Sequence, residues 1–192
     1  FAADAEAVGK AYGTTVIRAT GKKNPEIVLA FDGRLSTPEL RDALIAGLLS
    51  TGATVRNCGI GPTPMMYFSV FHLNADAGMM ITGSHNPPTH NGFKLMLGKN
   101  SFYGEDIQTM AALAARGDFE IGSGKEVQED ITDAYVKVLA GAFKPAGAKP
   151  IKVVFDAGNG SAGEITRKLV AALGNQHQLI NGEIDGNFPN HR

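Results

Sequence analysis

Ser84 is the residue of this sequence whose surroundings most favour chemistry. The apolar run at residues 77–81 predicts a short buried strand, and the polar string T-G-S-H-N-P-P follows at residues 82–88. His85 and Lys94 are close to the serine in sequence and could supply positive charge or protons to a group that its hydroxyl carries. The same residue types also build tight turns, so a purely structural turn is the alternative interpretation of this string.

Three neighbours of the serine have predictable backbone roles. Gly83 allows a backbone or a ligand to approach closely, Asn86 can hydrogen-bond within its own turn, and Pro87 prevents a helix from continuing. We therefore expect the serine on an irregular loop at the end of a strand.

The elements that must position this loop alternate along the chain. Apolar runs predict strands at residues 26–31, 54–58, 77–82, 93–97, 151–155 and 177–180. Amphipathic or apolar stretches predict helices at residues 3–20, 36–51, 63–72, 105–116 and 131–143, and one after the glycine loop that ends at about residue 173. This alternation predicts α/β layers with helices on both faces of a sheet.

Local signals add finer expectations. Ser36 and Glu39 have the spacing of a capping box, and Gly52 should end the helix that they begin. Gly13 should weaken the middle of the first helix. The Gly- and charge-rich residues 117–130 predict a surface excursion.

Composition limits the classes of protein to consider. The chain has 192 residues, 43% hydrophobic and 19% charged, which is typical of a soluble globular protein. Its net charge of −1 predicts no binding to nucleic acid, and no apolar run approaches the roughly 20 residues that would span a membrane. Cys58 is the single cysteine, which suits a reducing compartment, and we expect a cytoplasmic location.

The domain organisation follows from one linker-like string. K-P-A-G-A-K-P at residues 144–150 has two prolines and no apolar pattern, and it predicts a boundary between a domain at 1–143 and part of a second domain at 151–192. The sequence begins inside a helical pattern and ends just after a polar loop, so we expect a fragment of a longer protein.

Five strings together resemble one enzyme family. They are T-G-S-H-N-P-P with N-G-F-K at 82–94, D-G-R-L-S at 32–36, G-P-T-P at 61–64, D-A-G-N-G at 156–160 and D-G-N-F-P-N-H at 185–191. In this order they resemble the α-D-phosphohexomutases, most closely the bacterial phosphomannomutase/phosphoglucomutase branch. The resemblance implies a mixed-sheet, layered α/β domain of the phosphohexomutase type, followed by part of a second such domain.

The resemblance also implies a reaction and a set of site residues. Phosphorylated Ser84 would give its phosphoryl group to a mannose or glucose monophosphate and regain one from the bisphosphorylated sugar, so that the 1- and 6-phosphates interconvert. Lys94 would be the acid/base or charge-stabilising group, and His85 a second contact. Loop and substrate support would come from Thr82, Gly83, Asn86, Asn91, Asp32 and Arg34. An internal ion pair between Asp32 and Arg34 that shapes the loop is the alternative role for those two residues.

The implied cofactor is Mg²⁺, held against the phosphate on Ser84. The family's Asp-Gly-Asp-Gly-Asp-Arg loop, which supplies the aspartate ligands, is absent from this sequence. We therefore expect the 192 residues alone to be inactive. The residues that choose between mannose, glucose and glucosamine are absent as well.

Two other functions stay open. Residues Gly158 to Gly163 fit G-x-G-x-x-G between a predicted strand and helix, with Glu183 and Asp185 about 20 residues on, which is typical of a dinucleotide-binding unit. Asp156 counts against it, because its carboxylate would lie near the pyrophosphate. The third hypothesis is a non-catalytic phosphosugar-binding protein, which the absent metal loop keeps open.

Overall fold

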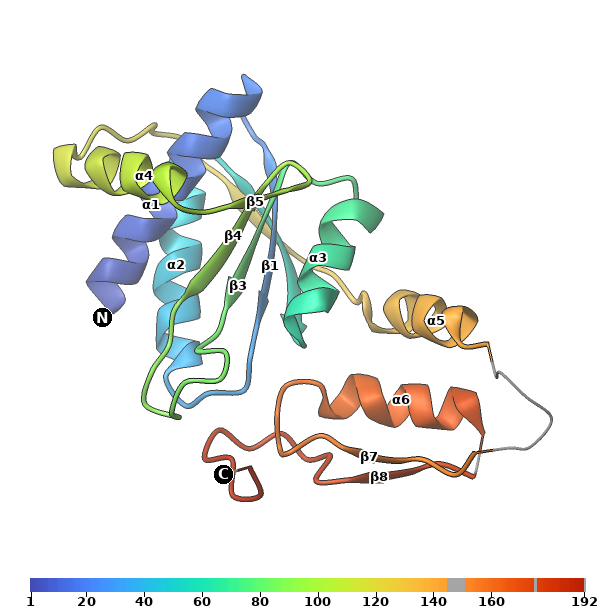
Figure 1. Ribbon diagram of the computed structural model, residues 1–192. Helices are drawn as coiled ribbons and strands as arrows, with labels where there is room; N and C mark the ends of the chain where they lie inside the picture. Colours follow the sequence, from blue (N-terminus) through green and yellow to red (C-terminus); the bar gives the residue numbers. More distant parts are fainter. Residues whose placement is uncertain (145–150, 175, 192) are drawn as a thin grey trace.

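The computed structural model describes residues 1–144, 151–174 and 176–191. The helices are α1 (Ala2–Thr20), α2 (Thr37–Thr51), α3 (Thr63–His72), α4 (Glu105–Arg116), α5 (Thr132–Ala142) and α6 (Gly163–Leu173) (Figure 1). The strands are β1 (Glu26–Phe31), β2 (Thr54–Ile60), β3 (Ala77–Ile81), β4 (Phe93–Leu97), β5 (Asn100–Phe102), β6 (Lys125–Gln128), β7 (Val154–Asp156) and β8 (Gln178–Ile180).

A six-stranded sheet in the order β5-β4-β3-β1-β2-β6 forms the centre of the larger part of the chain. Strands β1, β2, β3 and β6 run parallel, and β4 pairs antiparallel with both of its neighbours. The expectation of a mixed sheet in a layered α/β fold is therefore confirmed.

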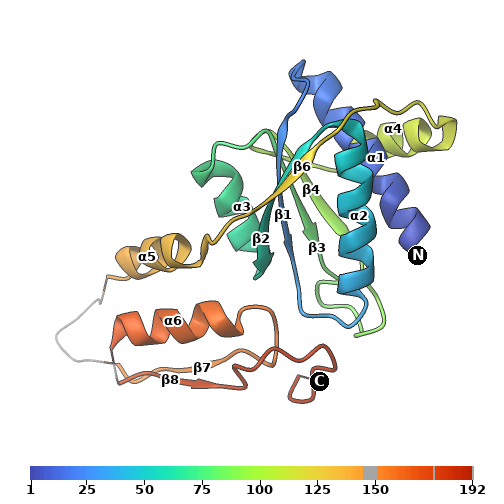
Figure 2. The ribbon, with the colours of Figure 1, turned by 180° about the vertical axis from the view of Figure 1, so that it is seen from behind.

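Helices cover both faces of this sheet (Figures 1 and 2). Successive side chains of a strand point to opposite faces. Accordingly, Ile27 and Leu29 of β1 join the buried cluster under α1, α2 and α4, whereas Val28 and Ala30 join the cluster under α3. Because β1 is buried on both faces, its sequence is a continuous apolar run rather than an alternating one.

Helices α1 and α2 approach each other through glycines. A Cβ atom on Gly9 would lie 2.5 Å from the carbonyl oxygen of Leu44, and one on Gly47 would overlap the main chain of Glu6. Gly13 lies against the side chain of Thr51 in the same way, and α1 continues through it without a break. The glycine that should weaken the helix is therefore also one that permits its close packing.

Two local expectations are wrong. Residues 117–130 are not a surface excursion throughout, because β6 adds to the edge of the sheet beside β2. Its exposed charged side chains are typical of an edge strand and look like loop residues in the sequence. The capping box at Ser36 does not form, since that residue has helical dihedral angles and makes no side-chain cap hydrogen bond.

A smaller unit, here called the second unit, comprises residues 151–174 and 176–191. Its strands β7 and β8 are parallel and joined through α6, and β7 begins at Val154 rather than at residue 151. Ile165 of α6 belongs to the same buried cluster as Tyr135 of α5, and the Lys168 Nζ lies 2.7 Å from Asp133 Oδ1. All of the predicted linker except Lys144 lies outside the described residues, so the boundary there stays a prediction.

Within the described residues, no helix is both long enough and apolar enough to span a bilayer.

The glycine contact between α1 and α2 predicts a strong effect of one methyl group. Gly9→Ala should lower the free energy of unfolding by about 2 kcal/mol, because the new Cβ has no space beside α2. Gly141→Ala in α5 is the matched control, since a Cβ there meets no atom within 4 Å. It should change stability by less than about 1 kcal/mol, in the stabilising direction. Urea unfolding of the two variants measures both values, and equal effects would contradict the packing role of Gly9.

Candidate active site

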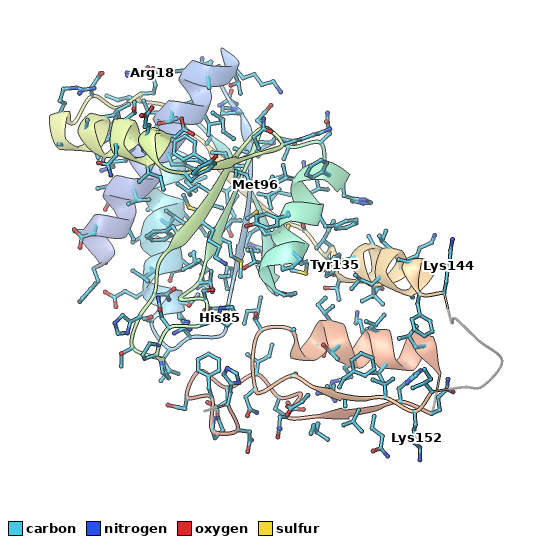
Figure 3. The ribbon with its side chains drawn as sticks, viewed as in Figure 1. Arg18, His85, Met96, Tyr135, Lys144 and Lys152 are labelled. Atoms are coloured by element: carbon cyan, nitrogen blue, oxygen red, sulfur yellow. The ribbon has the colours of Figure 1, made fainter. Side chains whose placement is uncertain are left out.

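The loops that follow β1, β2 and β3 meet at one edge of the sheet. Because these three strands are parallel, their carboxyl ends lie together, which is where ligands bind in open α/β sheets. A cavity of about 510 Å³ opens there, lined by residues that include Asp32, Thr63 and Ser84. Figure 3 shows His85 at this edge, at the end of the sheet nearest the second unit. The cavity is also lined from that unit by Gly158, Gly160, Ser161 and His191.

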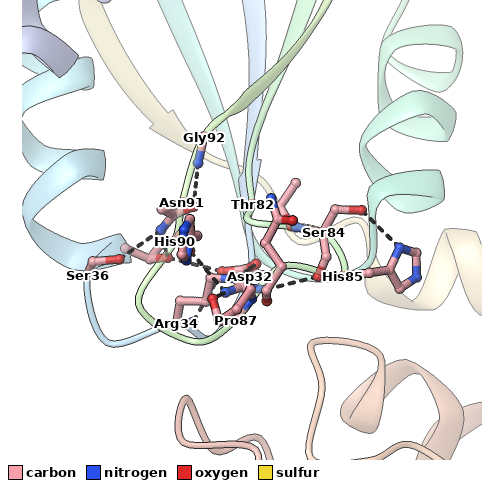
Figure 4. A network of polar contacts seen from close by, with 12 residues as sticks. Asp32, Arg34, Ser36, Thr82, Ser84, His85, Pro87, His90, Asn91 and Gly92 are labelled. Atoms are coloured by element: carbon pink, nitrogen blue, oxygen red, sulfur yellow. Dashed lines mark hydrogen bonds and ion pairs between the residues drawn. The ribbon is translucent and has the colours of Figure 1, made fainter. Parts of the chain in front are cut away.

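The loop at residues 82–92, which carries Ser84 and joins β3 to β4, is here called the serine loop. The Arg34 guanidinium organises this loop (Figure 4). Its Nε donates to Asp32 Oδ2 at 3.0 Å. Its Nη1 donates to the carbonyl oxygens of Pro87 at 2.6 Å and His90 at 2.9 Å, and its Nη2 donates to those of Ser84 and Asn86, each at 2.9 Å. All five N–H donors of the group are thus directed at protein acceptors, so Arg34 has none left for a phosphate.

Asp32 completes this buried ion pair. Its Oδ1 accepts hydrogen bonds from the backbone N–H of Arg34 and from the Thr37 hydroxyl, each at 3.1 Å. The side chains of Arg34 and Asp32 are only 3% and 9% exposed, and burial of these two opposite charges is tolerated because every polar atom of the two side chains has a partner. The ion pair considered as the alternative from the sequence is present, and it shapes the loop.

The backbone of Ser84 is held by hydrogen bonds, whereas its side chain is exposed. Its φ of 54° is in the left-handed region, which is uncommon for a residue other than glycine and is often found at functional sites. Its N–H donates to Thr82 Oγ1 at 2.9 Å, and its carbonyl accepts from Arg34. The exposed hydroxyl lies 3.3 Å from Nδ1 of His85.

Three other loop residues from the sequence-based set shape the loop, two through the backbone and one through its side chain. A Cβ on Gly83 would lie 2.5 Å from Cζ of Arg34, so only glycine fits there. Asn86 closes a turn through its N–H to the carbonyl of Gly83 at 3.0 Å. Asn91 donates through Nδ2 to the hydroxyls of Ser36 and Thr37, which ties the end of the loop to the start of α2.

Lys94 lies on β4, directly opposite Met80 of β3. Opposed residues of an antiparallel pair share a face of the sheet, and Met80 lines the cavity. Lys94 itself is half-buried and is not part of the cavity wall, and within the described residues it forms no ion pair. The structure therefore places Lys94 beside the cavity, on the strand that begins where the serine loop ends.

The second unit forms one wall of the cavity. None of its residues is among the site residues chosen from the sequence. Gly158 and Asn159 turn the chain with φ values of 52° and 59°. The Asp156 carboxylate accepts from Asn181 Nδ2 at 3.0 Å and from the Gly158 N–H at 2.9 Å, and these bonds hold its pKa below the usual value. The strings at 156–160 and 185–191 are the sequence signal for this wall, but neither reveals which of its residues would face Ser84.

The residues of the site do not by themselves fit Mg²⁺. Among the residues that the structure describes, no three His, Cys, Asp or Glu side chains gather as a metal site. Asp32 is the one carboxylate in the described cavity wall, and it is engaged by Arg34 and Thr37. A hard cation with oxygen ligands would need further carboxylates.

Comparison with known proteins identifies the family. The family model described as "Phosphoglucomutase/phosphomannomutase, alpha/beta/alpha domain I" matches residues 2–121. The chain belongs to this family. It is 42% identical over 176 residues to a phosphoglucomutase of Neisseria gonorrhoeae, covering 91% of this chain and 38% of that protein.

Two further relatives agree with the phosphoglucomutase/phosphomannomutase assignment. The phosphomannomutase/phosphoglucomutase of Pseudomonas aeruginosa PAO1 is 40% identical over 184 residues, covering 96% of this chain and 39% of that protein. The crystal structure of a phosphoglucomutase/phosphomannomutase family protein from Burkholderia thailandensis superposes with a TM-score of 0.89 at 41% identity, covering all of this chain and 42% of that one. The chain thus spans about two fifths of the length of these relatives.

The five hydrogen bonds donated by Arg34 predict that loss of its planar guanidinium group will lower the stability of the protein strongly. Arg34→Lys keeps the charge but leaves loop carbonyls without donors, and it should lower the free energy of unfolding by about 3 kcal/mol. Arg167→Lys is the matched control, because Arg167 pairs with Glu164 and Glu183 but is 51% exposed, and it should cost less than about 1 kcal/mol. Urea unfolding separates the two, and a cost for Arg34→Lys no larger than that of the control would refute the organising role.

Proposed function

We propose that this chain carries the phosphorylated serine of a phosphoglucomutase/phosphomannomutase and that Ser84 is that serine. The observation that supports this most is the construction of its loop. The backbone on both sides of Ser84 is fixed by Thr82 and Arg34, whereas its hydroxyl is exposed at the cavity. A nucleophile that must attack and leave in line benefits from a fixed backbone.

In the first half of the proposed reaction, a phosphoryl group passes from Ser84 to a free hydroxyl of a hexose monophosphate. The bond between Ser84 Oγ and phosphorus breaks, a bond between phosphorus and the sugar oxygen forms, and the proton of the sugar hydroxyl is transferred so that Ser84 regains its O–H. The bisphosphorylated sugar reverses its orientation in the site and returns its other phosphate to Ser84. The product is the isomeric monophosphate, and the enzyme is phosphorylated again.

Proton exchange and neutralisation of the phosphate charge are assigned to different side chains. We assign exchange of the hydroxyl proton to His85, and the 3.3 Å distance between its Nδ1 and Ser84 Oγ supports this assignment. Arg34 cannot neutralise the phosphate, because its donors are used within the loop. That role is assigned to Lys94, which would turn its ammonium group toward a phosphate at the cavity.

Mg²⁺ is proposed as the cofactor, with a phosphate oxygen on Ser84 as one ligand. Mg²⁺ supplies charge neutralisation on the transferring phosphoryl group when it is bound. Since the described residues do not complete its ligand set, we assign this chain no step through Mg²⁺, and we propose that the 192 residues alone do not turn over substrate.

The substrates proposed are hexose phosphates, namely the 1- and 6-phosphates of glucose and mannose with the 1,6-bisphosphate as intermediate. Relatives carry both sugars in their names, phosphoglucomutase and phosphomannomutase/phosphoglucomutase. A non-catalytic phosphosugar-binding protein would not need an exposed hydroxyl on a strained backbone, so the enzyme is favoured.

A dinucleotide-binding function is less well supported, although β7, α6 and β8 do form a parallel β–α–β unit around the glycine loop. The backbone N–H groups that would contact a pyrophosphate are already bonded. Those of Gly158, Asn159 and Gly160 donate to Asp156 Oδ1 and to the carbonyls of Asn181 and Ala157.

Removal of the proposed nucleophile should abolish turnover without unfolding. Ser84→Ala in the full-length protein should show no conversion of glucose 1-phosphate or mannose 1-phosphate and no phosphate on the protein by intact mass. Its melting temperature should stay unchanged, because an exposed hydroxyl packs against little. Ser101→Ala on β5 is the matched control and should retain activity. Full turnover by the Ser84 variant would exclude the proposal.

Replacement of Lys94 tests its proposed contact with the phosphate. Lys94→Met should reduce kcat by about 10²-fold, the scale of one acid/base or charge contact. Lys99→Met, in which the exposed Lys99 faces the ring of Phe71, serves as the control and should change kcat less than about threefold. If Lys94 is only a solvated strand residue, both variants will behave alike and Ser84 phosphorylation will be normal in each.

A further inference from the structure

Phe188 of the second unit covers the guanidinium that organises the serine loop. The Cζ of Arg34 lies 5.3 Å from the centroid of the Phe188 ring. Since the in-plane N–H groups of Arg34 are all directed at acceptors, the flat face of the guanidinium is the part left for another contact. A cation over the face of an aromatic ring is favourable, and the ring shields the neighbouring hydrogen bonds of Arg34 from water.

This contact is one of three between the same two segments. A Cβ on Gly33 would overlap the side chain of Ile184, and a Cβ on Gly186 would lie 2.6 Å from the carbonyl oxygen of Gly33. The segment 184–188 therefore lies directly on the loop that connects β1 to α2. Small residues at both contact points make this close approach possible.

Phe188 is itself held in an unusual backbone conformation. Its φ of 49° is in the left-handed region, where a bulky side chain is rare and needs support from its surroundings. The support comes from within the second unit. The N–H of Phe188 donates to the carbonyl of Asp185 at 3.0 Å, and the buried Asn159 binds the segment through Glu183 and Asn190.

We infer that Phe188 is a positioning residue through which the second unit holds the serine loop in place. The ring acts on Arg34, and Arg34 acts on the carbonyls of Ser84, Asn86, Pro87 and His90. Without the ring, water competes for the guanidinium and the loop loosens. The structural part of this inference stands on the contacts alone, whereas its consequence for catalysis rests on the proposed function.

Hydrogen exchange of the full-length protein tests the structural part without any assay of activity. Phe188→Leu should speed exchange of the protected loop amides of Ser84, Asn86 and His90 by about threefold to tenfold, with no change in strand β1. Phe155→Leu is the matched control, because Phe155 is also a half-buried aromatic residue of the second unit and packs on His177 instead. It should leave those three amides unchanged. If Phe188→Leu does not fold, Phe188→Met replaces it.

Kinetics of the same variants test the consequence for catalysis. With glucose 1-phosphate, Phe188→Leu should lower kcat by about tenfold with KM changed less than about twofold, and Phe188→Tyr, which keeps the ring, should restore kcat. Unchanged exchange of the loop amides, or equal acceleration by Phe188→Leu and Phe155→Leu, would overturn the inference. A full-length protein with no mutase activity at all would instead refute the proposed function, and the exchange result would still decide whether Phe188 positions the loop.

Discussion

The hydrogen bonds of the Arg34 guanidinium are the interaction on which the rest of the site depends. The loop after β3 is rich in Gly, Asn and Pro and forms neither helix nor strand, so its carbonyl groups have no regular partners. Arg34 supplies four of those partners from one rigid, permanently charged group. The left-handed backbone of Ser84 is stable because its neighbours are fixed in this way.

Much of this arrangement could be predicted from the sequence, since buried strands give the strongest signals. Both β1 and β3 are continuous apolar runs, because each is covered by helices on two faces. The polar residues that follow each strand predict that Asp32 and Ser84 lie on loops at the ends of these strands. That Arg34 reaches the carbonyls beside Ser84 depends on β1 and β3 being neighbours in the sheet, and strand order is not a local property of the chain.

The features that the sequence did not predict correctly also depend on contacts between distant parts of the chain. Strand β6 carries charged residues on an exposed edge, so its pattern resembles that of a loop until β2 is there to pair with it. Phe188 lies in a short polar turn, and nothing in that turn indicates that its ring would cover a guanidinium from the opposite end of the chain. Ser36 has the residue type of a cap, but its hydroxyl accepts a hydrogen bond from Asn91 instead.

The antiparallel direction of β4 has a consequence for how Ser84, the proposed nucleophile, is held. A parallel successor to β3 would require a crossover to the other end of the sheet, whereas β4 follows the loop at residues 82–92 and pairs Phe93 with Ile81. The two ends of the serine loop are thus joined by the sheet itself, and the entropy of closing the loop is lost when the hairpin forms. Folding of the domain and preorganisation of the serine are one event, so the sugar phosphate proposed as substrate would meet a loop whose ends need no further ordering.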